Sequence, residues 1–91
     1  VIDVERHEVC IEGDIVNVTA TEFRILHLLA SHPGRVFARE QILSQVFDVG
    51  TFVVARNVDV HIRGLRKKMG TLRDLIETIR GVGYRFRDEE G

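Results

Sequence analysis

The residues that could carry chemistry in this sequence are few, and most have an ordinary structural explanation. His7 and Cys10 could be metal ligands, but two ligands make no structural zinc site, and on a strand they point to opposite faces. Asp59 could be an acid catalyst, yet it precedes Arg63 by four residues, which favours a helical ion pair. Gly81-Val82-Gly83 lies between strand-like runs rather than before a helix, so it is no phosphate-cradling loop. We therefore expect no enzyme, no metal site and no cofactor.

The basic residues are the remaining candidates, and they are unevenly distributed. The chain has a net charge of −1, but residues 1–50 carry −4 and residues 51–91 carry +3. Within residues 56–87, nine Lys and Arg meet only three acids. This asymmetry suggests a polyanionic partner, although a basic helix that is merely solvated has the same composition.

The basic segment also has the strongest helical pattern in the chain. Val58, Ile62, Leu65 and Met69 recur at i, i+4, i+7 and i+11, which predicts a helix from about 55 to 69 with one buried face. Gly70 then stands where a left-handed helix cap is expected. The opposite face is cationic: it holds Arg56, Val60, Arg63, Gly64 and Lys67, with Asn57 beside them and His61 and Arg66 on the flanks.

The elements that must position this helix lie on both sides of it. Short β-branched runs at 1–4, 8–11 and 14–18 predict antiparallel strands. Thr19 and Glu22 form a capping box that begins a first helix, which Pro33-Gly34 ends. After a short extended segment at Val36-Phe37, a second helix is expected from about Arg39 to Phe47, followed by a loop. Residues 75–80 and 84–87 predict a C-terminal hairpin with glycines in its turn.

Composition limits the class of protein. With 44% hydrophobic and 30% charged residues in 91 positions, we expect one globular domain covering 1–91. The longest uninterrupted apolar run, residues 52–55, is far too short to span a bilayer. Cys10 is the only cysteine, so no internal disulfide can form and a cytoplasmic location is the expectation. Because the chain starts at Val1 rather than Met, we also expect it to be part of a longer protein.

Three strands, three helices and a terminal hairpin, with the third helix basic, are the layout of an α+β winged helix-turn-helix. A helix with one apolar and one cationic face can pack on its own domain and still enter a DNA major groove about 12 Å wide. The runs Val58 to Gly70 and Ile76 to Phe86, with Thr19 to Phe23 and Pro33 to Gln41, resemble the C-terminal effector domain of OmpR/PhoB-type response regulators.

The resemblance implies a transcription factor of a bacterial two-component system. Its N-terminal receiver domain, absent from this chain, would be phosphorylated by a histidine kinase, and the protein would then bind tandem DNA half-sites as a dimer. The resemblance places the recognition helix at about 55–69 and the wing at 76–86. It also implies a contact between the loop at 48–54 and RNA polymerase.

Residue by residue, the resemblance implies a set of DNA contacts. Val60 would touch a thymine methyl group, and Arg80 would enter the minor groove. The residues expected at bases or adjacent phosphates are Arg56, Asn57, Val60 and Arg63; those expected at the backbone are Arg39, His61, Arg66, Thr78 and Tyr84, and Lys67 completes the cationic ridge. Two positions depart from the family: Gly64 replaces a residue that often reads a base, and Phe47 replaces a tryptophan.

The alternative is a winged helix that binds another protein. Such a module would present an apolar anchor cluster on the outer face of the third helix. Here that face holds a single valine among Arg56, Arg63 and Lys67, so the sequence favours DNA.

Overall fold

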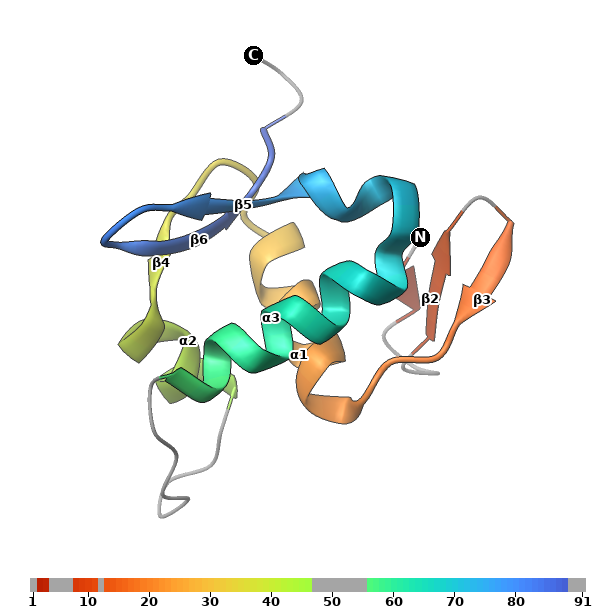
Figure 1. Ribbon diagram of the computed structural model, residues 1–91, viewed down its shortest axis with the longest axis horizontal. Helices are drawn as coiled ribbons and strands as arrows, with labels where there is room; N and C mark the ends of the chain where they lie inside the picture. The colour runs from red at the N-terminus through yellow and green to blue at the C-terminus, as the bar shows by residue number, and fades with distance from the viewer. Residues whose placement is uncertain (1, 4–7, 12, 47–55, 89–91) are drawn as a thin grey trace.

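The computed structural model describes residues 2–3, 8–11, 13–46 and 56–88. In Figure 1 two small antiparallel sheets lie at opposite ends of the molecule, with α1 and α3 between them and α2 beside β4. The elements, in chain order, are β1 (Ile2–Asp3), β2 (Glu8–Ile11), β3 (Asp14–Val16), α1 (Ala20–Ala30), β4 (Phe37–Ala38), α2 (Arg39–Val46), α3 (Arg56–Met69), the 3₁₀ helix η1 (Gly70–Leu75), β5 (Ile76–Ile79) and β6 (Gly83–Phe86). The expected α+β architecture is confirmed.

Antiparallel strands form at the N-terminus, as the β-branched runs predicted, and their order in the sheet is β1-β2-β3. Val9 in the central strand is buried and Ile2 packs against the same core. The sheet therefore closes one end of the core.

Helix α1 begins at the predicted capping box. The Thr19 side chain accepts a hydrogen bond from the backbone N–H of Glu22, and the Glu22 carboxylate accepts one from the backbone N–H of Thr19, each 3.0 Å long. The helix ends at Ala30, before the predicted Pro33-Gly34, because Ser31 caps it with backbone and side-chain hydrogen bonds to the carbonyl of His27. The end of α2 predicted at Phe47 lies outside the described residues.

The second sheet has the order β4-β6-β5, so the predicted C-terminal hairpin gains a third strand. Phe37 pairs with Tyr84 and Ala38 with Gly83. A Cβ at Gly83 would lie 2.0 Å from the carbonyl oxygen of Phe37, so only glycine allows β4 to approach this closely. The two-residue strand was not expected as a sheet partner, and it joins the start of α2 to the hairpin.

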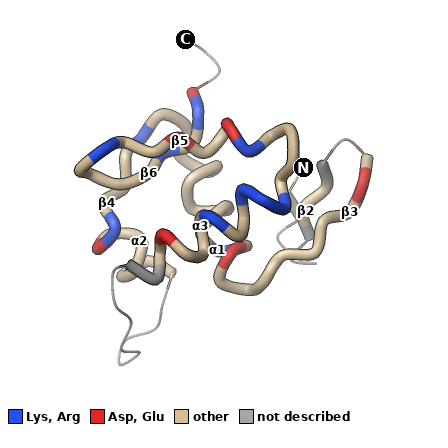
Figure 2. The backbone as a smooth tube through the Cα atoms, viewed as in Figure 1, with Lys and Arg blue, Asp and Glu red and all other residues tan. Residues whose placement is uncertain are grey.

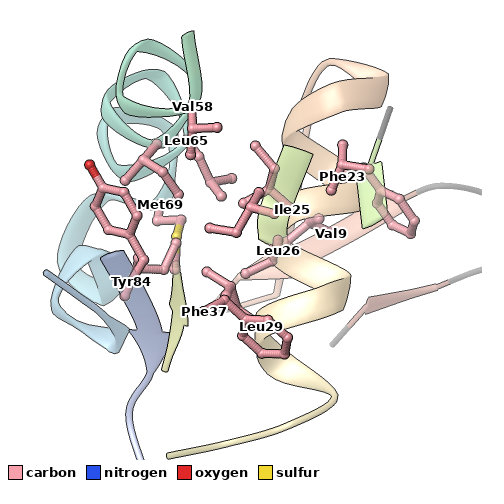
Figure 3. Packing of buried hydrophobic residues seen from close by; sticks show 14 residues of the cluster. Val9, Phe23, Ile25, Leu26, Leu29, Phe37, Val58, Leu65, Met69 and Tyr84 are labelled. Carbon is pink, nitrogen blue, oxygen red and sulfur yellow. The ribbon is translucent and has the colours of Figure 1, made fainter. Parts of the chain in front are cut away.

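The core lies between α1, α3 and the second sheet, as Figure 3 shows. The predicted apolar face of α3, with Val58, Ile62, Leu65 and Met69, is buried throughout. Residues from the other elements complete the cluster; they are Val9, Phe23, Ile25, Leu26, Leu29, Phe37, Ile42, Val46, Ile76 and Tyr84. Burial of this face fixes the rotation of α3 and therefore decides which of its side chains face solvent.

Candidate nucleic-acid interface

The outer face of α3 carries an exposed valine between cations, as the sequence predicted. Val60 is 63% exposed, and Arg63 and Lys67 follow it at i+3 and i+7, both exposed. His61 is half-buried on the flank. Arg56 begins the helix and Asn57 follows it, but their side chains lie outside what the structure describes.

Gly64 faces a different neighbour from the one expected. A Cβ at this position would lie 2.7 Å from Oε2 of Glu22, which belongs to the first turn of α1. The other oxygen of that carboxylate accepts a hydrogen bond from Nζ of Lys68 at 2.7 Å. Gly64 is half-buried where α3 passes the first turn of α1, so a Cβ there could be accommodated only if the Glu22 carboxylate shifts.

Glu22 is a charged side chain that is only 5% exposed. Burial alone would raise its pKa, but the hydrogen bonds from Lys68 and Thr19 and the charge of Lys68 outweigh burial, so the pKa is lowered. The carboxylate is thus held ionised where α1 and α3 meet. The capping box pointed to the role of Glu22 within α1, while nothing local in the sequence pointed to Lys68, 46 residues away.

Asp59 is the centre of a polar cluster beside the exposed face of α3. Its Oδ1 accepts a hydrogen bond from Nε of Arg39 at 2.8 Å and another from the hydroxyl of Tyr84. The predicted pair with Arg63 is therefore wrong: Arg63 acts on Asp59 only through its charge. Tertiary partners from α2 and β6 reach the carboxylate directly, and an exposed pair within one helix is worth only about 0.3–0.5 kcal/mol.

The contacts within this cluster shift the pKa values of Asp59, Tyr84 and Arg39. The hydrogen bond from Tyr84, with the smaller effects of Arg39 and Arg63, lowers the pKa of Asp59 despite its partial burial. Burial, followed by the hydrogen bond to Asp59, raises the pKa of Tyr84. The hydrogen bond to Asp59 raises the pKa of Arg39. Asp59 is thus fixed as an anion that orients Arg39 and Tyr84.

Arg66 connects α3 to the wing. Its Nη2 donates to the carbonyl of Ile76 and to the hydroxyl of Thr78, both at 2.7 Å. The guanidinium carbons of Arg66 and Arg39 lie 5.6 and 5.3 Å from the centre of the Tyr84 ring. The structure therefore gathers four of the five predicted backbone-contacting residues, Arg39, Arg66, Thr78 and Tyr84, into one connected group, while His61 lies on the flank of α3.

The predicted minor-groove residue, Arg80, stands apart from this group at the turn of the wing. The turn is closed by a hydrogen bond from the N–H of Val82 to the carbonyl of Ile79, and Gly81 takes a positive φ of 78°. Arg80 and Val82 are both exposed. The wing thus carries one cation at its tip.

Two neighbouring hollows run along the junction of α3 and the wing. The first, of about 470 Å³, is lined by Arg39, Asp59, Arg63, Arg66, Lys67, Arg73 and Tyr84. The second, of about 410 Å³, is lined by Arg66, Arg73, Asp74, Ile76, Glu77, Thr78 and Arg87. Figure 2 shows the corresponding concentration of basic segments in the C-terminal half of α3, in η1 and in the wing.

The first hollow has an excess of positive charge. Its one carboxylate, Asp59, is engaged by Arg39, while Arg63, Lys67 and Arg73 form no ion pair with any acid in the described part of the chain. Cations placed together without counter-charge repel one another, and a bound polyanion relieves that repulsion. The arrangement can therefore hold a chain of phosphate groups next to an exposed helix face.

Within ranges 2–3, 8–11, 13–46 and 56–88, no three His, Cys, Asp or Glu side chains are grouped to hold a metal ion. No helix in the same ranges is long and apolar enough to cross a membrane.

Three helices, an antiparallel wing and an exposed cationic third helix define a winged helix-turn-helix domain. Residues 13–86 match the family model described as "Transcriptional regulatory protein, C terminal", and the chain belongs to that family. The OmpR/PhoB resemblance found in the sequence is thereby confirmed.

Individual members of the family are similar to this chain in sequence and in structure. The chain is 41% identical over 87 residues to the phosphate regulon transcriptional regulatory protein PhoB of Escherichia coli K12, covering 93% of this chain and 38% of that protein. The DNA-binding domain of Bacillus subtilis CssR superimposes with a TM-score of 0.84 at 40% identity, covering 94% of this chain and 97% of that one. The DNA-binding domain of the response regulator AdeR, solved in complex with an intercistronic region, gives 0.82 at 31% identity, covering 97% and 93%.

Proposed function

We propose that the chain binds double-stranded DNA at specific sites and regulates transcription as the effector domain of a two-component response regulator. The observation that carries the proposal is the outer face of α3, where an exposed Val60 stands beside Arg63 and Lys67 at the rim of a cationic hollow. The AdeR domain, of the same fold, has been solved with DNA. We place this activity in the cytoplasm.

The proposed mechanism separates contacts that position the domain from contacts that read sequence. Arg39, His61, Arg66, Thr78 and Tyr84 would bind the phosphate backbone. Asp59 would hold Arg39 in place, while Tyr84 would have to turn its one hydroxyl proton from Asp59 to a phosphate on binding. The role of Asp59 toward Arg39 follows from their 2.8 Å hydrogen bond, and all three residues line the same hollow.

Reading would fall to the exposed face of α3 and to the tip of the wing. Val60 would contact a thymine methyl group and Arg63 a base edge or an adjacent phosphate. Arg56 and Asn57 are proposed to act at bases or phosphates from the start of the helix, and Lys67 to add to the cationic ridge. Arg80 would enter an A·T-rich minor groove, where a narrow groove attracts arginine.

The remaining elements of the proposal concern the longer protein. The chain spans 38% of the length of its PhoB relative, which leaves room for a receiver domain. We propose that phosphorylation of that receiver by a histidine kinase promotes dimerisation on tandem half-sites. The loop at 48–54, outside the described residues, is the proposed contact with RNA polymerase.

The test is selection from a random double-stranded DNA pool, followed by competition between the selected duplex and a scrambled duplex across salt concentrations. We expect a tandem motif that outcompetes the scrambled duplex by about 10³-fold or more, the range of specific regulators. Binding at low salt alone would not support the proposal, because any cationic surface binds DNA electrostatically. If even two tethered copies bind without sequence preference, the proposal fails and a protein-interaction module replaces it.

A further inference from the structure

Arg73 lies outside the recognition helix and outside the strands of the wing. It belongs to η1, the short 3₁₀ segment between α3 and β5, and it is exposed. No residue of η1 is among the expected DNA contacts. Yet Arg73 lines both hollows, a position it shares only with Arg66 among the residues lining them.

Arg66 and Arg73 both form a hydrogen bond with the backbone of Ile76. The N–H of Ile76 donates to the carbonyl of Arg73, while the carbonyl of Ile76 accepts from Nη2 of Arg66. Arg73 is therefore anchored through its main chain at the start of β5, where the side chain of Arg66 also ends. Because the anchor uses only the main chain, the guanidinium of Arg73 is left for another partner.

The charges around Arg73 indicate what that partner is. In the second hollow, Glu77 is engaged by Arg85 at 2.8 Å and by Arg87 at 3.9 Å. In the first hollow, Asp59 is engaged by Arg39 and Tyr84. No acid in the described part of the chain forms an ion pair with Arg73. Arg66 and Arg73 both line the boundary between the two hollows, and Asp74 is the only acid next to Arg73 in sequence. An anion spanning the divide would offset their repulsion.

We propose that Arg73 binds a phosphate of the DNA backbone next to the one held by Arg66, so that the interface continues from α3 across η1 toward the wing. This inference rests on the proposed DNA-binding function and adds a contact to it. The contact is to backbone only, since Arg73 projects from neither the recognition helix nor the tip of the wing. It contributes affinity that is independent of sequence.

The experiment measures the salt dependence of binding for the 91-residue chain and its Arg73→Ala variant, using the selected duplex and its scrambled control. Loss of one phosphate contact reduces the slope of log K against log salt by about 0.9. We expect this reduction on both duplexes, an affinity lowered about three- to tenfold near 0.15 M salt, and an unchanged ratio between the duplexes. Arg73→Lys, which keeps the charge, should restore most of the slope.

Arg35→Ala is the matched control. Arg35 is also an exposed arginine, but its guanidinium carbon lies 4.9 Å from the centre of the Phe37 ring, and the residue lines neither hollow. We expect it to leave the slope unchanged, and thermal unfolding should show that both alanine variants keep the wild-type fold.

Three results would overturn the inference about Arg73. An unchanged slope in Arg73→Ala, with wild-type binding intact, removes Arg73 from the interface and leaves the proposed function standing. A changed ratio between the duplexes would mean that Arg73 reads sequence. A wild-type chain that shows neither selection nor a salt slope would refute the proposed function, and the Arg73 contact with it.

Discussion

Gly64 offers the sharpest test of how the recognition helix is held. Replacing a glycine in the interior of a helix by alanine ordinarily stabilises a protein by about 1 kcal/mol. At this position the new Cβ would lie 2.7 Å from Oε2 of Glu22, whereas ordinary van der Waals contact begins at 3.4 Å. We therefore predict that Gly64→Ala destabilises the wild-type chain and stabilises a chain that lacks the Glu22 carboxylate.

The magnitude follows from the bonds that the carboxylate must loosen when it retreats. Its Oε1 accepts from the Thr19 N–H at 3.0 Å and from Lys68 Nζ at 2.7 Å. The capping bond is worth about 1 kcal/mol, and the Lys68 bond also about 1 because the lysine side chain is 36% exposed. Loss of both hydrogen bonds would cost about 2 kcal/mol, and the higher helix propensity of alanine would return about 1 kcal/mol. We therefore expect Gly64→Ala to have a free energy of unfolding about 1 kcal/mol below that of wild type.

The assay is a double-mutant cycle by urea denaturation of wild type, Gly64→Ala, Glu22→Ala and the double variant. In the Glu22→Ala background we expect alanine at 64 to add about 1 kcal/mol, which gives a coupling free energy of about 2 kcal/mol. A coupling below about 0.5 kcal/mol, the level found for independent sites, would show that Glu22 does not constrain position 64. The four m-values must agree, so that the comparison reflects folded-state contacts.

Three further predictions concern the interface. Arg63→Ala should weaken binding to the selected duplex by about 1–3 kcal/mol if the residue reads a base, and competition binding with single-base variants checks this. Arg80→Ala should mainly reduce the preference for A·T-rich flanking sequence, so equal flank preference in variant and wild type would contradict its role. Tyr84→Phe removes the hydrogen bond to Asp59, whose side chain is 38% exposed, and should cost about 1 kcal/mol of unfolding free energy at pH 7. Because the folded-state pKa of Asp59 is lowered, this stabilisation is present above about pH 3.9 and disappears as the pH falls through the folded pKa; a cost that persists in acid would refute the pairing.

Local sequence signals predicted the elements that have a clear period or a clear cap. The apolar repeat from Val58 to Met69 predicted α3 and its buried face, and the box formed by Thr19 and Glu22 predicted the start of α1. The two-residue strand β4 was missed as a sheet partner, because a segment this short has no measurable alternation. Its pairing depends on the absence of a side chain at Gly83, 46 positions after Phe37.

The site, too, was predictable only where local sequence determines it. The exposed positions of Val60, Arg63 and Lys67 follow from helical geometry once the buried face is known. The partner of Asp59 could not be predicted, since Arg39 and Tyr84 reach it from other elements and only the folded chain brings them together. A rule for neighbours within one helix selected Arg63 instead, because sequence spacing alone carries no information about tertiary competitors.

The bonds at Ile76 also protect the wing from unwanted assembly. Among the described strands, β5 pairs only with β6 and is one of the two edges of its sheet, where open backbone groups could recruit a strand from another molecule. At Ile76 both groups are occupied, the N–H by the carbonyl of Arg73 and the carbonyl by the guanidinium of Arg66. A second copy could extend the sheet here only by displacing Arg66, one of the proposed phosphate-binding residues. The hydrogen bonds that anchor Arg73 and position Arg66 therefore also leave no open backbone group at the start of this edge strand.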